Sequence, residues 1–258
     1  MVVKEVEKRK EIAVKAALEA GKMLKENFGR ISGIKTKSDR NLVTDLDLKA
    51  DEIITNIIKK AFKDDNILSE ERDIPELTAE YTWIIDPIDG THNFIRSIDI
   101  FGVSVGVAQG DKVIAGVIYM PISGELYSAV KGKSAYCNGN EINVSNKDLS
   151  SSTLIFDSTI HYNRDAMLTS LGSLADKVFN VRMLGSTVRG LGYVADGKAD
   201  LEVEYNDKVW DFAAGLLIIE EAGGKVTDLE GKEWNIKTQG YVASNGVMHD
   251  EVIRIING

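Results

Sequence analysis

The sequence predicts an α+β protein in which helices pack on sheets in layers, with mixed and antiparallel sheets. Three observations predict this class. Apolar residues recur at helical spacing over two long segments near the amino terminus. A run of strands separated by short turns follows, and in the second half short strands and helices succeed one another. With 43% hydrophobic residues among 258, the chain is able to bury such a core.

The first half begins with two predicted amphipathic helices. Apolar side chains spaced three, four and seven apart run from Val6 to Phe28, and Gly29 follows where a helix cap belongs. A polar, basic stretch at 35–41 leads to a second helix that begins at about Thr44. The strands predicted after it are 66–70 and 81–86, and then an antiparallel meander of 101–108, 112–120 and 124–130.

A polar, serine-rich connection at 145–152 predicts a boundary between two closely packed subdomains, 1–150 and 151–258. In the second subdomain, the helix predicted at 209–222 is apolar nearly all round and should therefore be buried. The strands predicted here are 154–156, 177–180, 201–205, 225–227 and 241–243, and the other helices are 164–171, 186–195 and 247–256.

The charge balance limits the classes of partner. With 31 basic and 40 acidic side chains, the chain carries a net charge of -9, which on average repels nucleic acids and anionic membranes. An anionic ligand therefore needs a positive intermediary. The longest apolar run, 212–219, is far shorter than the ~18 residues that span a bilayer. Since the amino terminus lacks an apolar leader segment and the lone Cys137 cannot form an intrachain disulfide, we expect a soluble, cytoplasmic protein.

Two aspartates at the end of an apolar strand are the first candidates for a site. In the segment 83–91, Asp86 and Asp89 stand three residues apart with Pro87 between them, so both carboxylates can face one point. Carboxylate oxygens suit Mg²⁺, and the backbone amides of Gly90 and Thr91 could receive a phosphate beside the metal. The alternative is a turn whose aspartates only accept hydrogen bonds from backbone amides. The motif alone leaves both interpretations open.

Three further acidic positions add to the motif, each with a structural alternative. Glu70 and Glu71 end a predicted strand, where a cation could relieve their repulsion, although such a pair often lies in a solvated loop. Asp211 starts the buried helix, where an acidic side chain also favours the helix dipole. Asp47 stands three residues after Thr44, which is the spacing of a helix capping box.

The chain resembles the inositol monophosphatase superfamily of Mg²⁺-dependent, lithium-sensitive sugar phosphatases. Two long segments carry the resemblance, WIIDPIDGTHNF at 83–94 and WDFAAGLLIIEEAGG at 210–224. Shorter supporting segments are NLVTDLD at 41–47, SEE at 69–71, GKSAYCNGNEI at 132–142 and LGS at 184–186. The resemblance implies an αβαβα sandwich, the sugar phosphatase fold, in which both subdomains form one catalytic unit, and it implies a homodimer.

The resemblance also implies roles for individual residues. Two or three Mg²⁺ ions would share a set of ligands, and Li⁺ would inhibit. The implied metal ligands are Glu70, Asp86, the carbonyl oxygen of Ile88, Asp89 and Asp211. The implied catalytic residues are Glu70, Thr91 and Asp47. The Thr91 hydroxyl, paired with Asp47, would help to orient and deprotonate the attacking water, and Glu70 would share a third, weaker ion with waters. The residues implied to surround the substrate are Ile88, Asp89, Gly90, Thr91, Gly185, Ser186, Thr187, Glu204 and Asp211.

The implied reaction is hydrolysis of a small sugar or polyol phosphate by a metal-activated water, with inositol 1-phosphate as the first candidate substrate. Fructose 1,6-bisphosphate is the second, alone or in a dual-specificity phosphatase, because some prokaryotic members of the superfamily accept both. Glu204 favours neutral hydroxyls, whereas Arg182 and Arg189 could receive a second phosphate if they face the site. More distant alternatives are a 3′-phosphoadenosine nucleotide phosphatase and a non-catalytic binding module. His92, His161 and His249 are expected on the surface or in loops, without a catalytic role.

Overall fold

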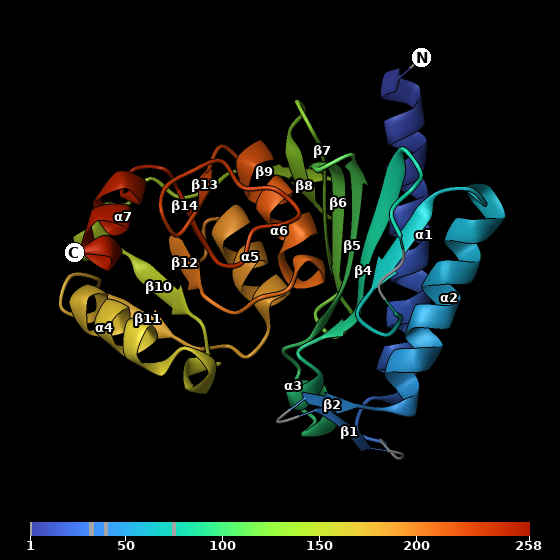
Figure 1. Ribbon diagram of the computed structural model, residues 1–258, viewed down its shortest axis with the longest axis horizontal. Coiled ribbons are helices and arrows are strands. Elements are labelled where there is room, and N and C mark those ends of the chain that lie inside the picture. Colours follow the sequence, from blue (N-terminus) through green and yellow to red (C-terminus); the bar gives the residue numbers. More distant parts are fainter. Residues whose placement is uncertain (1, 31–33, 39–40, 74–75) are drawn as a thin grey trace.

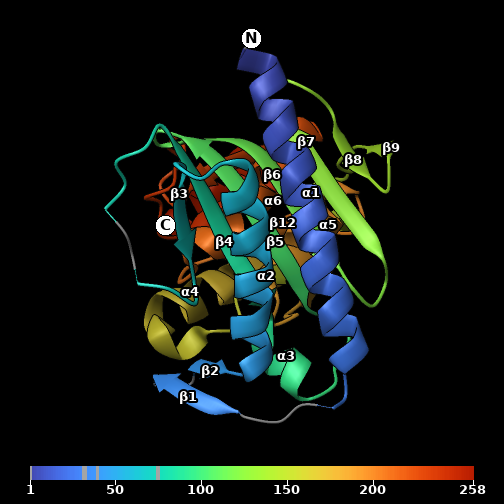
Figure 2. The ribbon, with the colours of Figure 1, turned by 90° about the vertical axis from the view of Figure 1, so that its right-hand side faces the viewer.

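The two amino-terminal helices form the first of five layers in the computed structural model, which describes residues 2–30, 34–38, 41–73 and 76–258. α1 (Val2–Asn27) and α2 (Asp45–Ala61) lie side by side on one face of the first sheet (Figures 1 and 2). The predicted stop at Gly29 is confirmed, because its φ of +76° suits a residue without a side chain. Thr44 caps α2, as its position in the sequence predicts.

The second layer is a seven-stranded sheet that contains the predicted meander. Its first two strands are parallel and all other neighbours are antiparallel. In spatial order the strands are β3 (Asn66–Ser69), β4 (Tyr81–Asp89), β5 (Gly102–Gln109), β6 (Lys112–Met120), β7 (Glu125–Val130), β8 (Ala135–Cys137) and β9 (Asn140–Ile142). The hairpin β8–β9 escaped prediction because strands of three residues are too short to show an alternating pattern.

The middle layer consists of α5 (Thr187–Ala195) and α6 (Val209–Glu221), which lie between the two sheets (Figure 1). The predicted burial of the second of these helices is confirmed, since residues 212–219 are all buried. β6 and α6 approach so closely that a Cβ atom at Gly116 would lie 2.5 Å from the carbonyl oxygen of Ala214. Only glycine fits this contact between two backbones.

The fourth layer is a five-stranded mixed sheet, and α4 (Arg164–Ala175) and α7 (His249–Asn257) cover its outer face as the fifth layer (Figure 1). The sheet order is β11 (Asn180–Arg182), β10 (Thr153–Phe156), β12 (Leu201–Glu204), β14 (Tyr241–Ser244) and β13 (Lys225–Asp228). β10 pairs in parallel with both neighbours, and the other pairs are antiparallel. The predicted αβαβα sandwich is therefore confirmed. The division at 150 remains a proposal, since α5 and α6 pack between both sheets.

Two local predictions differ from the structure. The basic stretch expected as a connection contains two antiparallel strands, β1 (Lys35–Ser38) and β2 (Asn41–Val43), while its residues 39 and 40 lie outside the described residues. The strand predicted at 177–180 begins later, because the amides of Lys177 and Val178 still bond to Leu174 at the end of α4. In the described ranges, no helix combines the length and the apolar character needed to cross a membrane.

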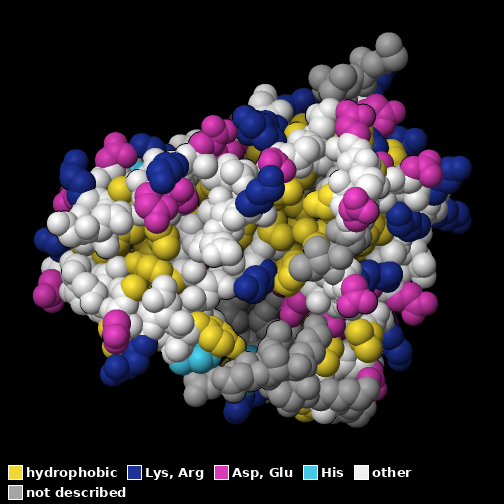
Figure 3. Space-filling view, in the orientation of Figure 1, with side chains coloured by type: hydrophobic (Ala, Val, Ile, Leu, Met, Phe, Trp, Pro, Cys, Tyr) yellow, Lys and Arg dark blue, Asp and Glu magenta, His cyan; other side chains and the backbone are white. Residues whose placement is uncertain are grey.

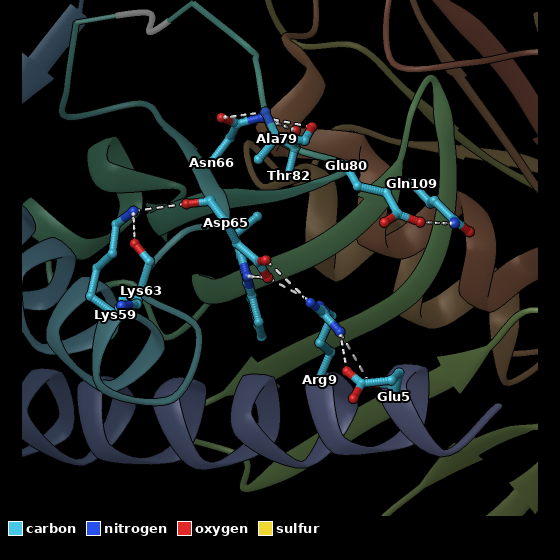
Figure 4. Close-up of polar contacts among 11 residues, drawn as sticks. Glu5, Arg9, Lys59, Lys63, Asp65, Asn66, Ala79, Glu80, Thr82 and Gln109 are labelled. Atoms are coloured by element: carbon cyan, nitrogen blue, oxygen red, sulfur yellow. Dashed lines mark hydrogen bonds and ion pairs between the residues drawn. The ribbon is translucent and has the colours of Figure 1, made fainter. Parts of the chain in front are cut away.

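A buried arginine fastens α1 to the first sheet near β3 and β4 (Figure 4). Arg9 donates to both carboxylate oxygens of Asp65 at 3.0 and 3.2 Å, and Asp65 also accepts from the indole nitrogen of Trp83 at 2.9 Å. The guanidinium lies 3.7 Å from the ring centre of Tyr81 and 4.2 Å from that of Phe62. The carboxylate of Asp65 and the two aromatic rings together hold the buried Arg9 guanidinium in one position. This contact holds α1 against the start of β3 and β4, the strands whose opposite ends lead to Glu70 and Asp86.

Candidate active site

A cleft of about 490 Å³ opens where strands of both sheets end beside the first residues of three helices. The helices are the short α3 (Thr91–Ile95), α5 and α6. Among the residues that line the cleft are all the sequence candidates except Asp47: Glu70, Asp86, Ile88, Asp89, Gly90, Thr91, Gly185, Ser186, Thr187, Glu204 and Asp211. Segments more than 100 residues apart in the sequence thus meet at one place.

Three carboxylates converge at the floor of the cleft. Asp86, Asp89 and Asp211 each offer an oxygen, and these three oxygens lie within 4.8 Å of one another. β4 continues past Pro87 to Asp89, contrary to the expectation that the chain turns there, and its register shifts between the two aspartates. This irregularity directs both carboxylates toward α6, where Asp211 occupies the first turn.

These aspartates accept hydrogen bonds from backbone amides, as the turn interpretation predicts, and their oxygens also converge, as a metal site requires. Asp86 accepts from the amide of Ile88 at 3.0 Å, and Asp211 accepts from the amide of Lys208 at 2.7 Å. Asp89 accepts from the amides at the start of α5 and from the Ser186 hydroxyl. These local bonds orient the carboxylates and still leave oxygens that face one another.

The cleft gathers several carboxyl groups in one place. Figure 3 shows basic and acidic side chains interspersed over one face of the molecule. Within the cleft, burial raises the pKa of Asp89 to about 6. Burial, and then the charge of Glu70, raises the pKa of Asp86 well above its usual range. Oxygen donors that repel one another in a buried place form a fitting site for a hard divalent cation such as Mg²⁺.

Thr91 and Asp47 form a hydrogen-bonded pair beside this cluster. The Thr91 hydroxyl oxygen lies 3.2 Å from one oxygen of Asp47 and 2.9 Å from the carbonyl oxygen of Ile88, and its single hydrogen can be donated to either acceptor. The other oxygen of Asp47 accepts from the amide of Thr44 at 2.8 Å, which completes the capping box of α2. Asp47 therefore has both predicted contacts, one with the helix end and one with Thr91.

Glycine lets the two halves of the cleft approach each other at Gly90. Its φ is +83°, and a Cβ atom there would lie 3.0 Å from the carbonyl oxygen of Ile100 and 3.2 Å from that of Gly185. The Asn93 side chain donates to the carbonyl oxygens of Ile100, Leu184 and Gly185 at 2.8, 2.8 and 3.1 Å. These bonds hold the segment before α5 against α3.

Sequence reasoning missed two further acidic residues that line the cleft. Asp157 directly follows β10, and its oxygens accept from Thr159, Tyr205 and Asn206. Asp207 accepts from the hydroxyls of Thr187 and Tyr241, both at 3.1 Å. Burial, and then the charge of Asp157, raises the pKa of Asp207 to about 8. An aspartate just after a strand was the signal available for Asp157.

The expectation for the histidines is wrong for His249, which is fully buried in α7. Its two ring nitrogens lie 2.9 Å from the hydroxyls of Thr227 and Ser244, and burial lowers its pKa to about 4. His92 and His161 are exposed residues that line the cleft. His249 was misjudged because a single polar residue near the chain end gives no sign of burial.

Arg182 and Arg189 are not among the residues that line the cleft. Arg189 is buried and donates to Glu125 at 2.5 Å and to Ser123 at 2.9 Å, on the far side of α5. Arg182 is exposed and bonds to the carbonyl oxygen of Val181. The condition under which these arginines would bind a second phosphate is therefore not met.

Glu202 lies behind the cleft on β12 and has an unusual environment. It is fully buried, and neither carboxylate oxygen has a hydrogen-bond partner. Burial, and then the charge of Asp207, raises the pKa of Glu202 well above its ordinary value of 4.5. In the folded state Glu202 therefore holds a proton that the unfolded chain releases at neutral pH. The contribution of the protonated Glu202 carboxyl to the free energy of unfolding is fully present below pH 4.5. It is lost as the pH rises toward the pKa of Glu202 in the folded state.

Glu202→Gln should therefore gain stability relative to the native chain as the pH rises. Because glutamine does not titrate, the difference in free energy of unfolding should change by up to about 1.4 kcal/mol per pH unit above pH 4.5. Urea unfolding at pH 5 and pH 8 measures this difference. Glu52→Gln, on the exposed face of α2, is the control and should show none. Parallel stability curves for Glu202→Gln and the native chain would contradict the prediction.

Comparison with known proteins identifies similar chains over nearly the whole length. The model of the inositol monophosphatase family matches residues 5–258. The fructose-1,6-bisphosphatase/inositol-1-monophosphatase of Thermotoga maritima is 34% identical over 250 residues, which are 96% of each chain. Inositol monophosphatase 3 of Solanum lycopersicum is 35% identical and covers 98% of this chain and 97% of its own. The solved structure of a Thermotoga maritima IMPase is 33% identical and has a TM-score of 0.89 over 97% of both chains.

Proposed function

Since this chain belongs to the inositol monophosphatase family, we propose that it is a Mg²⁺-dependent phosphatase that hydrolyses inositol 1-phosphate to inositol and phosphate. The observation that carries the proposal is the convergence of Asp86, Asp89 and Asp211 in a cleft that Thr91 also lines. In the proposed assignment these three carboxylates, Glu70 and the carbonyl oxygen of Ile88 hold two or three Mg²⁺ ions. Bound Mg²⁺ would supply positive charge to the phosphate and lower the pKa of a coordinated water.

Other residues around the metals would position the attacking water, the phosphate and the alcohol. The Thr91 hydroxyl donates to Asp47, so its oxygen can accept a hydrogen bond from the attacking water. The water proton then has a route through Thr91 to the Asp47 carboxylate, with Glu70 orienting the water. The amides of Gly90 and Thr91, at the start of α3, would receive the phosphate. Glu204 and the segment 185–187 would hold the hydroxyls of the alcohol.

The lining of the cleft favours a monophosphate. Its residues include no lysine and no arginine among those that the structure describes, so a second phosphate would meet carboxylates without a cation. Fructose 1,6-bisphosphate, the second candidate, would have to bind its far phosphate against this charge. The relative from Thermotoga maritima bears both activities in its name, and for this reason both substrates belong in the test.

The proposal also includes the oligomeric state, inhibition by Li⁺ and the cellular location. We propose a homodimer, which light scattering measures, and inhibition by Li⁺, which a titration at fixed Mg²⁺ measures. We also propose that the enzyme works in the cytoplasm, where its one cysteine, Cys137, would stay reduced.

Phosphate release with Mg²⁺ and with EDTA tests the function. With Mg²⁺, kcat/KM for inositol 1-phosphate should exceed that for fructose 1,6-bisphosphate, and EDTA should abolish release until Mg²⁺ is restored. Activity on the bisphosphate alone would overturn the substrate assignment, and activity only on a 3′-phosphoadenosine nucleotide would replace it with the distant alternative. Absence of release from every sugar phosphate in both conditions would favour a non-catalytic binding module.

A further inference from the structure

Glu70, one of the proposed metal ligands, lies in a turn directly after β3. Its amide donates to the carbonyl oxygen of Ile85 at 3.2 Å, which brings Glu70 to the position beside Asp86. β3 is the edge strand of its sheet, and its pairing with β4 ends at Ser69. Of the described residues among 70–80, none belongs to a helix or a strand. Contacts outside the sheet must therefore hold this turn.

Asp51 on α2 contacts the turn on both sides of Glu70. One oxygen of Asp51 accepts from the Ser69 hydroxyl at 2.5 Å. The other oxygen accepts from Nε of Arg72 at 2.6 Å and lies 2.6 Å from Nη2 of the same side chain. Ser69 precedes Glu70 and Arg72 follows it by two residues, and the amide of Arg72 donates to the carbonyl oxygen of Ser69 at 3.2 Å. The Asp51 carboxylate therefore joins the two ends of the turn to α2.

Burial makes these contacts specific. Asp51 is 4% exposed and Ser69 is 1% exposed. A buried carboxylate is unfavourable unless it is paired and hydrogen-bonded, and hydrogen bonds to a charged group are shorter and about twice as strong as neutral ones. Each oxygen of Asp51 has such a donor. Since Asp51 keeps both donors only while Ser69 and Arg72 stay in place, the turn has one favoured position.

The same helix also contacts the other side of the candidate site. Asp47 and Asp51 are both buried and stand four residues apart, so they share one face of α2. Asp47 lies beside Thr91, whereas Asp51 bonds to the turn of Glu70. Figure 2 shows α2 lying along the face of the first sheet, where it packs on β4. One helical turn therefore relates the position of Glu70 to that of Thr91.

The Glu70 carboxylate has to be held against the charge of its neighbours. Glu70 and Asp86 line the same cleft, and after burial the charge of Glu70 is the next cause of the raised pKa of Asp86. Like charges at such a place repel each other, so a loosely held Glu70 would turn away from Asp86 before a cation binds. A turn that Asp51 fixes keeps the ligand in place, and Mg²⁺ binding then does not include the free-energy cost of ordering it.

We propose that Asp51 is a positioning residue of the metal site, which acts through Ser69 and Arg72 to hold Glu70 where Mg²⁺ binds. The inference rests on the proposed phosphatase function and adds to it a residue that is not among those lining the cleft. Residues that orient a metal ligand typically change metal affinity by about 10–100-fold. Loss of the Asp51 charge should therefore weaken Mg²⁺ binding to this extent, while kcat at saturating Mg²⁺ stays near the native value.

Calorimetric titration of the metal-free protein with Mg²⁺ measures the affinity without turnover. Asp51→Asn removes the charge at nearly constant volume, so the dissociation constant should rise by about 10–100-fold. Asp65→Asn is the matched control, because Asp65 is also a buried carboxylate that accepts from an arginine, but just before β3 begins. It should lower the stability to urea and leave the Mg²⁺ affinity unchanged. Kinetics with inositol 1-phosphate over a range of Mg²⁺ concentrations then show whether kcat recovers in Asp51→Asn.

Arg72→Met provides a second test that does not depend on the folding of Asp51→Asn, since the Arg72 side chain is 42% exposed. It should also weaken Mg²⁺ binding, and the double variant should bind no more weakly than the weaker single variant, because both changes break one contact. Native Mg²⁺ affinity in either single variant overturns the inference, as does an equal loss in Asp65→Asn or a kcat that stays low at saturating Mg²⁺. In these cases Mg²⁺-dependent hydrolysis by the native enzyme leaves the function standing. If the native protein neither binds Mg²⁺ nor releases phosphate, the proposed function fails and the inference with it.

Discussion

Asp89→Asn lowers kcat/KM by at least about 100-fold and leaves the fold intact. The amide has nearly the volume of the carboxylate but lacks its charge, so the converging group of Asp86, Asp89 and Asp211 loses one of its three anions. Changes outside a metal's direct ligands already cost about 10–100-fold, and a lost ligand should cost more. Steady-state kinetics with inositol 1-phosphate at several Mg²⁺ concentrations measure the effect.

The fold should survive because asparagine keeps one carbonyl oxygen. Asp89 accepts from the amides of Thr187 and Val188 at 3.2 and 3.3 Å, and the remaining oxygen can retain such a bond. Circular dichroism should therefore match that of the native protein. Asp176→Asn, at the exposed end of α4, is the matched control and should keep full activity. Unchanged turnover in Asp89→Asn would refute the assignment of the metal site.

Thr91→Val lowers kcat by about 10²–10⁴-fold, which is the usual contribution of a positioned proton-transfer group. Valine has the shape of threonine and removes the hydroxyl that can donate to Asp47 or to the carbonyl oxygen of Ile88. The water would then lose its route for the departing proton, while the carboxylate cluster stays unchanged. The quantity to measure is kcat at saturating Mg²⁺ and substrate.

Thr91→Ser is the informative companion of this variant. Serine restores the hydroxyl without the methyl group, so most of the lost activity should return. Asp47→Asn would be less informative, because Asp47 also accepts from the amide of Thr44 at the start of α2. If valine and serine reduce kcat equally, the hydroxyl has no part in the reaction.

The sequence predicted best those site residues that stand next to an apolar strand or helix. Asp86 and Asp89 follow an apolar strand, and Asp211 begins an apolar helix, so both positions could be recognised before their distance was known. The helical spacing of apolar residues likewise predicted α1 and α2. The periodicity of apolar residues could not predict which distant segments of the sequence come together. Their contact depends on how the two sheets pack around α5 and α6.

The residues that escaped prediction have roles that arise only from that packing. Asp207 and Asp157 look like loop residues in the sequence, and the folded chain brings both into the lining of the cleft and buries Asp157. Glu202 stands in a strand whose alternating pattern would suit an exposed face, yet α5 covers it so closely that a Cβ atom at Gly190 would lie 2.2 Å from its oxygen. No pattern of local spacing distinguishes these burials from exposure.

The close contact between Gly116 and Ala214 has a consequence for how this architecture can change during evolution. The first sheet and α6 touch backbone to backbone there, and the opposite side of α6 packs toward the second sheet. The same helix carries Asp211 into the cleft. Recombination that joined the first sheet of one relative to the second sheet of another would have to inherit a helix that matches both partners. The two halves of the chain must therefore diverge together, because a mismatch at this helix would displace a carboxylate of the site.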